Sequence, residues 1–315
     1  MNSSAENSSR AALVDRGLEW MLSSKARYRM ERIILTIAIL SYLVHLSLIF
    51  MVSRGWLPPI TGVLPNAISA IYTPFSFILV YEVYLLIYYL PKSTSFYIGK
   101  QYEIITLIII RRIFKDIGNL ELLPDWFRNE NDLRFTYDAV TSLVLFLLIC
   151  LFYMQVLRKD KAGQSSSDHS EIKSSTFLFL KKGIALILVP VMLALACYSF
   201  GSWISSTLLH HQSGIPVDMN LNQIFFDEFF TILIVVDVLL LLASLYYSDQ
   251  FQSIMRNSGF VISTILIKLS FSISGLTNNL MIIGSVLFGL LVLLIFNVFT
   301  RKVSPLFPGQ VQQKY

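Results

Sequence analysis

Residues 75–87 read FSFILVYEVYLLI, and residues 230–242 read FTILIVVDVLLLL. Each stretch is apolar except for one carboxylate, which is Glu82 in the first and Asp237 in the second. A helix needs about twenty mostly apolar residues to cross roughly 30 Å of hydrocarbon, and both runs are long enough. An ionised group at that depth is costly unless it is paired or hydrated. The two carboxylates therefore predict membrane helices that keep charge in their interior.

The composition of the whole chain indicates the same fold class. Of its 315 residues, 55% are hydrophobic and only 14% are charged, which an ordinary soluble domain does not sustain. We predict an all-α, polytopic integral membrane protein with eight transmembrane helices. The predicted spans are Arg32–Met51, Ile71–Leu90, Tyr97–Phe114, Ala139–Leu157, Gly183–Trp203, Phe225–Tyr247, Gly259–Gly275 and Asn279–Thr300.

The third and seventh spans contain most of the charge found inside the apolar stretches. Arg111 and Arg112 fall in the third span, and Lys268 falls in the seventh. A hydropathy window therefore scores these two spans lowest. The eight-helix prediction depends on their crossing the membrane.

The basic residues predict the orientation. If the eight spans alternate, most of the 25 Lys and Arg residues lie on the side of the N-terminus, and the outer loops are acidic or neutral. Cytoplasmic loops carry such an excess, so we expect both termini in the cytoplasm and the chain in the cell (inner) membrane. Residues 1–29 are predicted to form an amphipathic segment at the membrane surface. The net charge of +5 then reflects topology and contact with the bilayer, not a nucleic-acid partner.

An internal duplication is visible at an offset of 155 residues. Glu82 then lies over Asp237, while Lys100 is one position from Arg256 and Arg112 one position from Lys268. Residues 144–159, VLFLLICLFYMQVLRK, also resemble residues 286–302, VLFGLLVLLIFNVFTRK. We predict two parallel repeats, because an even number of spans in each unit keeps the same orientation. Each repeat is expected to be a four-helix bundle, at 30–160 and 177–303, with a cytoplasmic linker at 161–176 and a cytoplasmic tail at 304–315.

The spacing of charges predicts which residues pair. With Lys100 at the inner surface, Arg112 lies about 18 Å up its helix and Glu82 about 12 Å up the preceding one, so the two can meet. Arg111 points about 100° away from Arg112, and the repeat alignment favours Arg112 as the partner of Glu82. The second repeat predicts a corresponding pair between Asp237 and Lys268.

Two further acids have helical spacing to these bases. Glu103 lies one turn after Lys100 and is placed to neutralise it, while Asp116 is four residues after Arg112 and is placed to hold it from the outer side. The second repeat has no counterpart of either acid. Lys100, Glu103, Arg111, Asp116 and Arg256 are therefore predicted to support the two pairs.

These features resemble the phosphate-starvation-inducible E family of small four-span inner-membrane proteins. The resemblance covers about residues 33–161 and, more faintly, 178–302 as a second copy, in which no aspartate follows Lys268. It implies a fold and a location, and little chemistry. The matching features are YEVY around Glu82, the basic Lys100, Arg112, the following Asp116, Asp138 at the start of the fourth span, and the closing Arg158 and Lys159.

Three functions remain open for the charged groups. They can be structural ion pairs that specify helix packing, they can line a hydrated path for protons or small ions, or the bases can bind an anionic ligand. No metalloprotease, serine-hydrolase or phosphate-loop motif occurs, so neither an enzyme, a cofactor nor a metal site is predicted. A channel or transporter is the main functional prediction. The alternative is a non-catalytic structural protein, with a homo-oligomeric or protein partner at the N-terminus or the linker.

Overall fold

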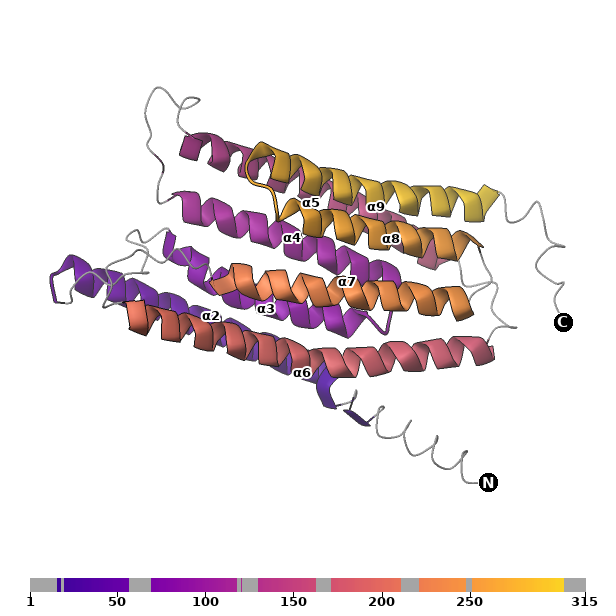
Figure 1. The fold of residues 1–315 in the computed structure, drawn as a ribbon, viewed down its shortest axis with the longest axis horizontal. Coiled ribbons are helices and arrows are strands. Elements are labelled where there is room, and N and C mark those ends of the chain that lie inside the picture. Colours follow the sequence, from indigo (N-terminus) through magenta and orange to yellow (C-terminus); the bar gives the residue numbers. More distant parts are fainter. Residues whose placement is uncertain are drawn as a thin grey trace.

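The computed structural model describes residues 16–17, 20–56, 69–117, 120, 130–162, 171–210, 221–247 and 251–302. Most of the predicted N-terminal segment, the middle of the linker and all of the C-terminal tail lie outside these residues. Every element within them is a helix, and each predicted span falls on one of them (Figure 1). The elements are α2 (Ser24–Ser53), η1 (Ser69–Ile71), α3 (Tyr72–Tyr89), α4 (Thr94–Ile117), α5 (Glu130–Ala162), α6 (Glu171–His210), α7 (Leu221–Tyr247), α8 (Phe251–Ser270) and α9 (Leu276–Lys302).

Within the described ranges, five helical stretches are long and apolar enough to cross a membrane. Thr73–Tyr89 is a shorter apolar helix, and α4 and α8 do not qualify. Such stretches characterise a multi-pass, membrane-embedded protein, and the crossing of all eight helices stays a prediction. The five are Ser24–Ser53, Asn131–Leu157, Phe177–Leu195, Glu228–Tyr246 and Leu276–Thr300.

The surroundings of α4 and α8 explain why these helices are less apolar. Between Thr94 and Phe114, none of the described side chains of α4 is exposed, so this helix has no face that needs to meet lipid. On α8 the exposed side chains form one narrow apolar stripe of Phe251, Met255, Ile262 and Leu269. Polar and charged residues on the other faces of both helices are covered by neighbouring helices.

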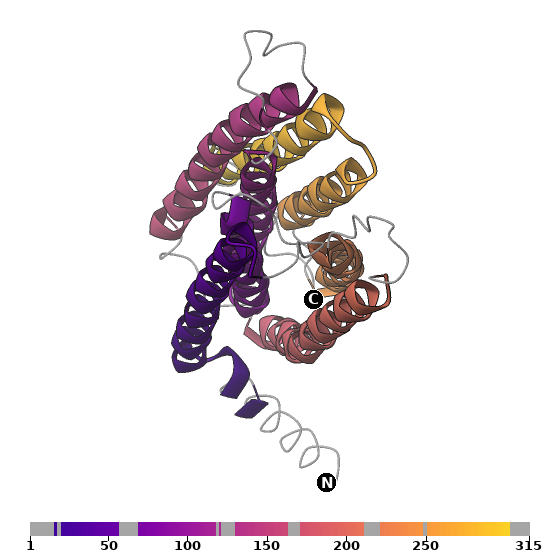
Figure 2. The same ribbon diagram turned by 90° about the vertical axis from the view of Figure 1, so that its left-hand side faces the viewer.

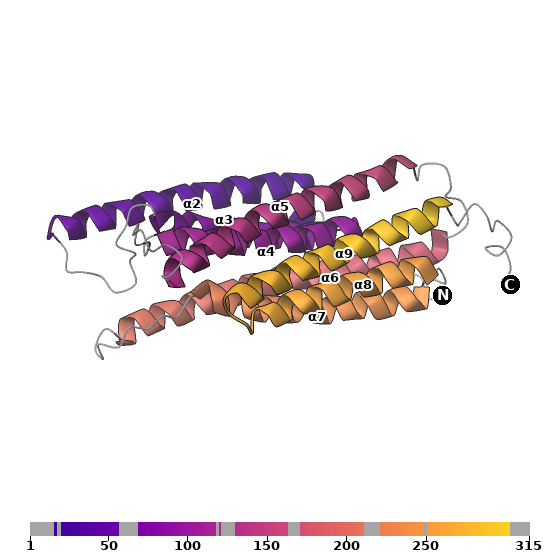
Figure 3. The same ribbon diagram turned by 90° about the horizontal axis from the view of Figure 1, so that it is seen from above.

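The helices lie side by side in one elongated body (Figures 1 and 3). Successive helices pack together from α2 to α5 and again from α6 to α9. The two halves are joined where α5 packs on α9, α3 on α6 and α4 on α8, and one hydrophobic core runs through both. The two halves therefore share one core, and the arrangement as two repeated four-helix bundles stays a prediction.

The direction of the helices defines two ends of the body. The start of α2 and the end of α9 lie at the same end, which we call the proximal end, and the other end is the distal end (Figures 1 and 3). The view along the helices shows α2 on the periphery of the body (Figure 2). Large apolar side chains of α2, such as Ile39, Leu40 and Val44, are exposed, as lipid-facing residues are.

Candidate functional site

Three clusters of polar side chains between the helices contain the predicted carboxylates, and the first is the Lys100 cluster of Glu82, Lys100, Glu103 and Tyr153. The Nζ atom of Lys100 lies 2.5 Å from Oε2 of Glu103 and 3.5 Å from Oε2 of Glu82. Tyr153 on α5 donates a hydrogen bond of 2.5 Å to Oε1 of Glu103. The cluster ties α3, α4 and α5 together, with two carboxylates around one ammonium group.

The predicted pair of Glu82 with Arg112 is wrong, because Lys100 is the basic partner of Glu82. The prediction placed Lys100 at the inner surface, but α4 begins at Thr94, which puts Lys100 already about 9 Å along the helix. Glu82 lies about 12 Å from the end of its own helix, at nearly the same height. Arg112 lies a further 18 Å or so away, near the distal end.

The second is the Arg112 cluster of Arg112, Asp138, Asn278 and Asn279. Arg112 contacts Asp138 through Nε and Nη2, each at 3.1 Å, and its Nη2 also donates to Oδ1 of Asn279 at 3.0 Å. Asn279 in turn donates to Oδ1 of Asp138 at 2.7 Å. The carboxylate that balances Arg112 is therefore Asp138 on α5, and Asp116 is not among the partners of Arg112.

The third is the Asp237 cluster, which lies between α4, α7 and α8. Asp237 is only 4% exposed. It accepts a hydrogen bond of 2.7 Å from the hydroxyl of Tyr97 and one of 3.0 Å from Nε2 of Gln101. Gln101 is held by Thr264, whose hydroxyl donates to its Oε1 at 2.7 Å. Both of these donors are neutral, and among the described residues, unlike in the other two clusters, no ion pair to this carboxylate is seen.

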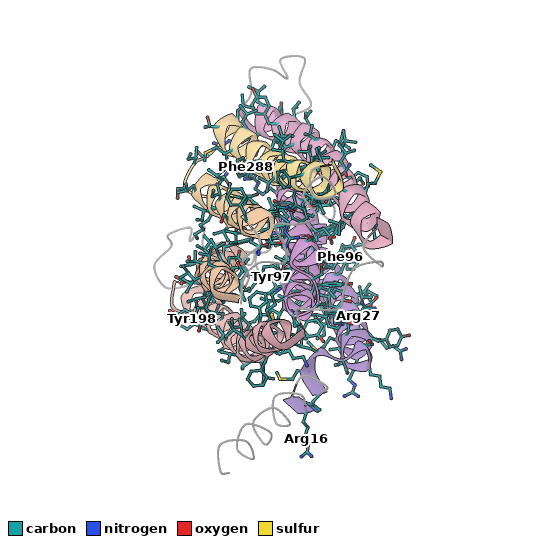
Figure 4. All side chains as sticks on the ribbon, turned by 90° about the vertical axis from the view of Figure 1, so that its right-hand side faces the viewer. Arg16, Arg27, Phe96, Tyr97, Tyr198 and Phe288 are labelled. Atoms are coloured by element: carbon teal, nitrogen blue, oxygen red, sulfur yellow. The ribbon has the colours of Figure 1, made fainter. Side chains whose placement is uncertain are left out.

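The predicted pair of Asp237 with Lys268 is also wrong. Asp237 lies about 15 Å before the end of α7, whereas Lys268 lies about 26 Å after the start of α8, so the two groups stand at different heights. The donors that replace Lys268 come from α4, in the other half of the chain. Figure 4 shows Tyr97 inside the bundle, in contrast to Tyr198 on its outer surface.

A hydroxyl pair extends the Asp237 cluster toward α9. Tyr102 lies one residue after Gln101, and its hydroxyl is 2.9 Å from Oγ of Ser263. Ser263 donates to the backbone carbonyl of Ser285 at 2.7 Å. Polar contacts thus run from α4 through α8 to α9, within an otherwise apolar core.

The structure also describes the other predicted basic residues. Arg111 is buried on α4. Arg256 donates to Oδ1 of Asn257, at 3.1 Å from Nη2, and its guanidinium lies 4.6 Å from the centre of the Phe296 ring. Lys268 lies in the last turn of α8.

A small, partly open cavity of about 30 Å³ lies beside Asp237. Four helices supply its walls, and the charged side chains among them are Asp237 and Lys181. Lys181 was not predicted as a site residue because it lies beside the polar linker. Tyr97 and Gln101 were not predicted because their side chains carry no charge. Their spacing of four residues, which puts both on one face of α4, was the available signal. The walls are Thr94, Tyr97, Ile98, Phe177, Lys181, Asp237, Leu240, Leu241, Asn257, Phe260 and Val261.

The chain matches no protein-family model, no curated protein and no solved structure. The resemblance to the phosphate-starvation-inducible E family therefore stays a prediction. No metal-binding group of three or more His, Cys, Asp or Glu side chains occurs within the described ranges. The functional argument rests on the three clusters.

Proposed function

We propose that the chain is a transport protein of the cell (inner) membrane that moves protons or small cations, with both termini in the cytoplasm and Asp237 as the group that binds the transported ion. The observation that carries the proposal is the combination of deep burial and neutral partners at Asp237. Ionisable groups at membrane depth are costly and characteristic of ion pathways. A carboxylate held by neutral donors such as Tyr97 and Gln101 can take up a proton or a cation without breaking an ion pair.

The other two clusters support this assignment by contrast. In the Lys100 and Arg112 clusters each acid already faces a base. Protonating Glu82 or Asp138 would weaken an ion pair that holds helices together. Asp237 is held by neutral donors, so protonating it breaks no direct ion pair between helices.

The test is a flux measurement with the purified full chain in proteoliposomes. An imposed pH gradient is expected to drive proton uptake in the wild type, and Asp237→Asn is expected to abolish it. The asparagine keeps the size and can still accept from Tyr97, so the variant is expected to elute as folded protein. Thr106→Val is the matched control, because this buried hydroxyl on α4 bonds only to the carbonyl of Tyr102, outside the Asp237 cluster. Wild-type flux in a folded Asp237→Asn protein would overturn the proposal, and so would an inactive wild type under proton and cation gradients.

The second candidate is a non-catalytic structural membrane protein, and the two balanced clusters favour it. Their ion pairs join α3, α4 and α5, and a hydrogen bond from Arg112 adds α9, as expected of groups that specify helix packing. On this alternative, Asp237→Asn changes stability and leaves no transport activity to lose. The same flux experiment therefore separates the two functions.

A further inference from the structure

The cavity beside Asp237 has the size and the wall chemistry of a water site. A water molecule needs about 10–15 Å³ of space for its centre and two to four polar partners. The cavity has about 30 Å³, enough for about two waters. Its walls offer the hydroxyls of Thr94 and Tyr97 and the amide of Asn257, together with the charged groups of Lys181 and Asp237.

Lys181 is the second buried charge that lines this cavity. Its side chain is only 8% exposed. Its Nζ atom donates to Oγ1 of Thr94 at 2.8 Å and lies 4.8 Å from the centre of the Phe177 ring. In the described part of the chain, no carboxylate lies within ion-pair distance of this ammonium group. A buried ammonium group needs polar partners as much as a buried carboxylate does.

The two charges are opposite, line one cavity and do not touch. Asp237 has neutral donors on α4, and Lys181 has a hydroxyl and an aromatic ring, so each is only partly compensated. Asn257 is another wall residue, and it accepts a hydrogen bond from Arg256. The guanidinium group of Arg256 therefore adds a second positive charge near the cavity. Water between them would accept from Lys181 and donate to Asp237, which satisfies both groups.

We infer that ordered water occupies this cavity and joins Lys181 to Asp237, and that protons reach Asp237 through it from the proximal end. The inference rests on the proposed function and specifies the entry point of the transported ion. In the transfer step, a proton on the cavity water passes to a carboxylate oxygen of Asp237 and the water accepts another proton from the proximal side. Lys181 keeps its own proton throughout. It is a positioning residue, which orients the water with its oxygen toward the ammonium group.

Hydration is tested by radiolytic hydroxyl-radical footprinting of the full chain in lipid nanodiscs, read by mass spectrometry. Radicals formed from bound water modify the side chains that the water touches. Tyr97 and Phe260 line the cavity and are expected to be modified although they are buried. Tyr102 and Phe152 are equally buried residues of the same two types outside these walls, and they are expected to stay unmodified. Equal protection of all four residues would overturn the inference, whatever the flux measurement gives.

The role of Lys181 is tested by a pair of variants. Lys181→Met keeps the length of the side chain and removes its donors, so the modification of Tyr97 and Phe260 is expected to fall. Proton flux is expected to fall by roughly tenfold, the effect of losing one hydrogen bond to a charged group. Lys181→Arg keeps a charged donor. It is therefore expected to restore part of the modification of Tyr97 and Phe260 and part of the proton flux, whereas a purely structural role of Lys181 does not predict this recovery.

The outcomes separate this inference from the proposed function. If Lys181→Met shows wild-type footprinting and wild-type flux, Lys181 does not hold the water and the inference is wrong while transport stands. If the wild type shows a hydrated cavity and no flux, the proposed function fails and, with it, the assignment of the cavity as an entry path.

Discussion

Lys100 shows how a single residue can decide the order of three helices. Its ammonium group lies between Glu82 on α3 and Glu103 on its own helix, and Glu103 also accepts from Tyr153 on α5. Without the ammonium group, two carboxylates would face each other in a partly buried position. Like charges in such surroundings repel strongly, since screening by solvent is incomplete.

We therefore expect Lys100→Met to lower the free energy of unfolding by roughly 2 kcal/mol, the range for a hydrogen bond to a charged group. Reversible unfolding in mixed detergent micelles, followed by circular dichroism, measures this change. Adding Glu103→Gln is expected to recover part of the loss, because one of the two facing carboxylates disappears. Lys92→Met is the control, since Lys92 is exposed and its ammonium group lies over the ring of Tyr88. Wild-type stability of Lys100→Met would show that the cluster does not hold the helices.

At the scale of an element, the end of one side chain of α4 reaches α9 at a glycine. The hydroxyl of Tyr102 rests against Gly289, where an added methyl group would collide with it and would lie 3.1 Å from Oγ of Ser263. Glycine thus leaves the space that the hydroxyl of Tyr102 occupies. The contact positions the hydroxyl pair that extends the Asp237 cluster toward α9.

Gly289→Ala is expected to separate Tyr102 from Ser263 and to destabilise the fold by about 1–3 kcal/mol, as overpacking does. Gly284→Ala is a matched control on the same helix, because a methyl group there meets nothing within 4 Å. That substitution is expected to be neutral or mildly stabilising, since alanine is the better helix former. Thermal unfolding monitored by size-exclusion chromatography compares the two. Equal midpoints would mean that α4 and α9 can shift apart at no cost.

At the scale of the whole molecule, the number of crossings determines where the chain ends lie. The eight helices place the start of α2 and the end of α9 at the same end of the body (Figure 3). Five crossings, the number of stretches that qualify by length and composition within the described ranges, would place the two ends on opposite sides. The two possibilities give opposite results in one experiment.

We expect epitope tags at the N-terminus and the C-terminus to respond in the same way to added protease. In spheroplasts both tags are protected, and in inverted vesicles both are digested. Both tags should be cut only in inverted vesicles, because the basic residues predict cytoplasmic termini. Tags that respond in opposite orientations would refute the eight-span fold. They would also remove α4, with its share of the Asp237 cluster, from membrane depth.

The helices could be predicted from the sequence, whereas the partners of the charges could not. The apolar runs located helices such as α3 around Glu82 and α7 around Asp237, whereas α4 and α8 do not qualify by apolar composition. The height of Lys100 depends on where the turn before α4 ends, and a shift of six residues moves a side chain by about 9 Å. The donors of Asp237 lie about 140 residues away in the sequence, in the other half of the chain. Only the packing of the two halves brings them together, and no local pattern encodes that packing.

The enclosure of α4 has a consequence for biosynthesis. A helix that is covered on all sides, and whose own sequence does not qualify it as a membrane span, gains little from lipid when it leaves the ribosome. Its neighbours α3 and α5 supply the surfaces that make insertion favourable. On the eight-span prediction, we therefore expect α4 to enter the bilayer together with α3 and α5, whereas α2 is long and apolar enough to enter by itself.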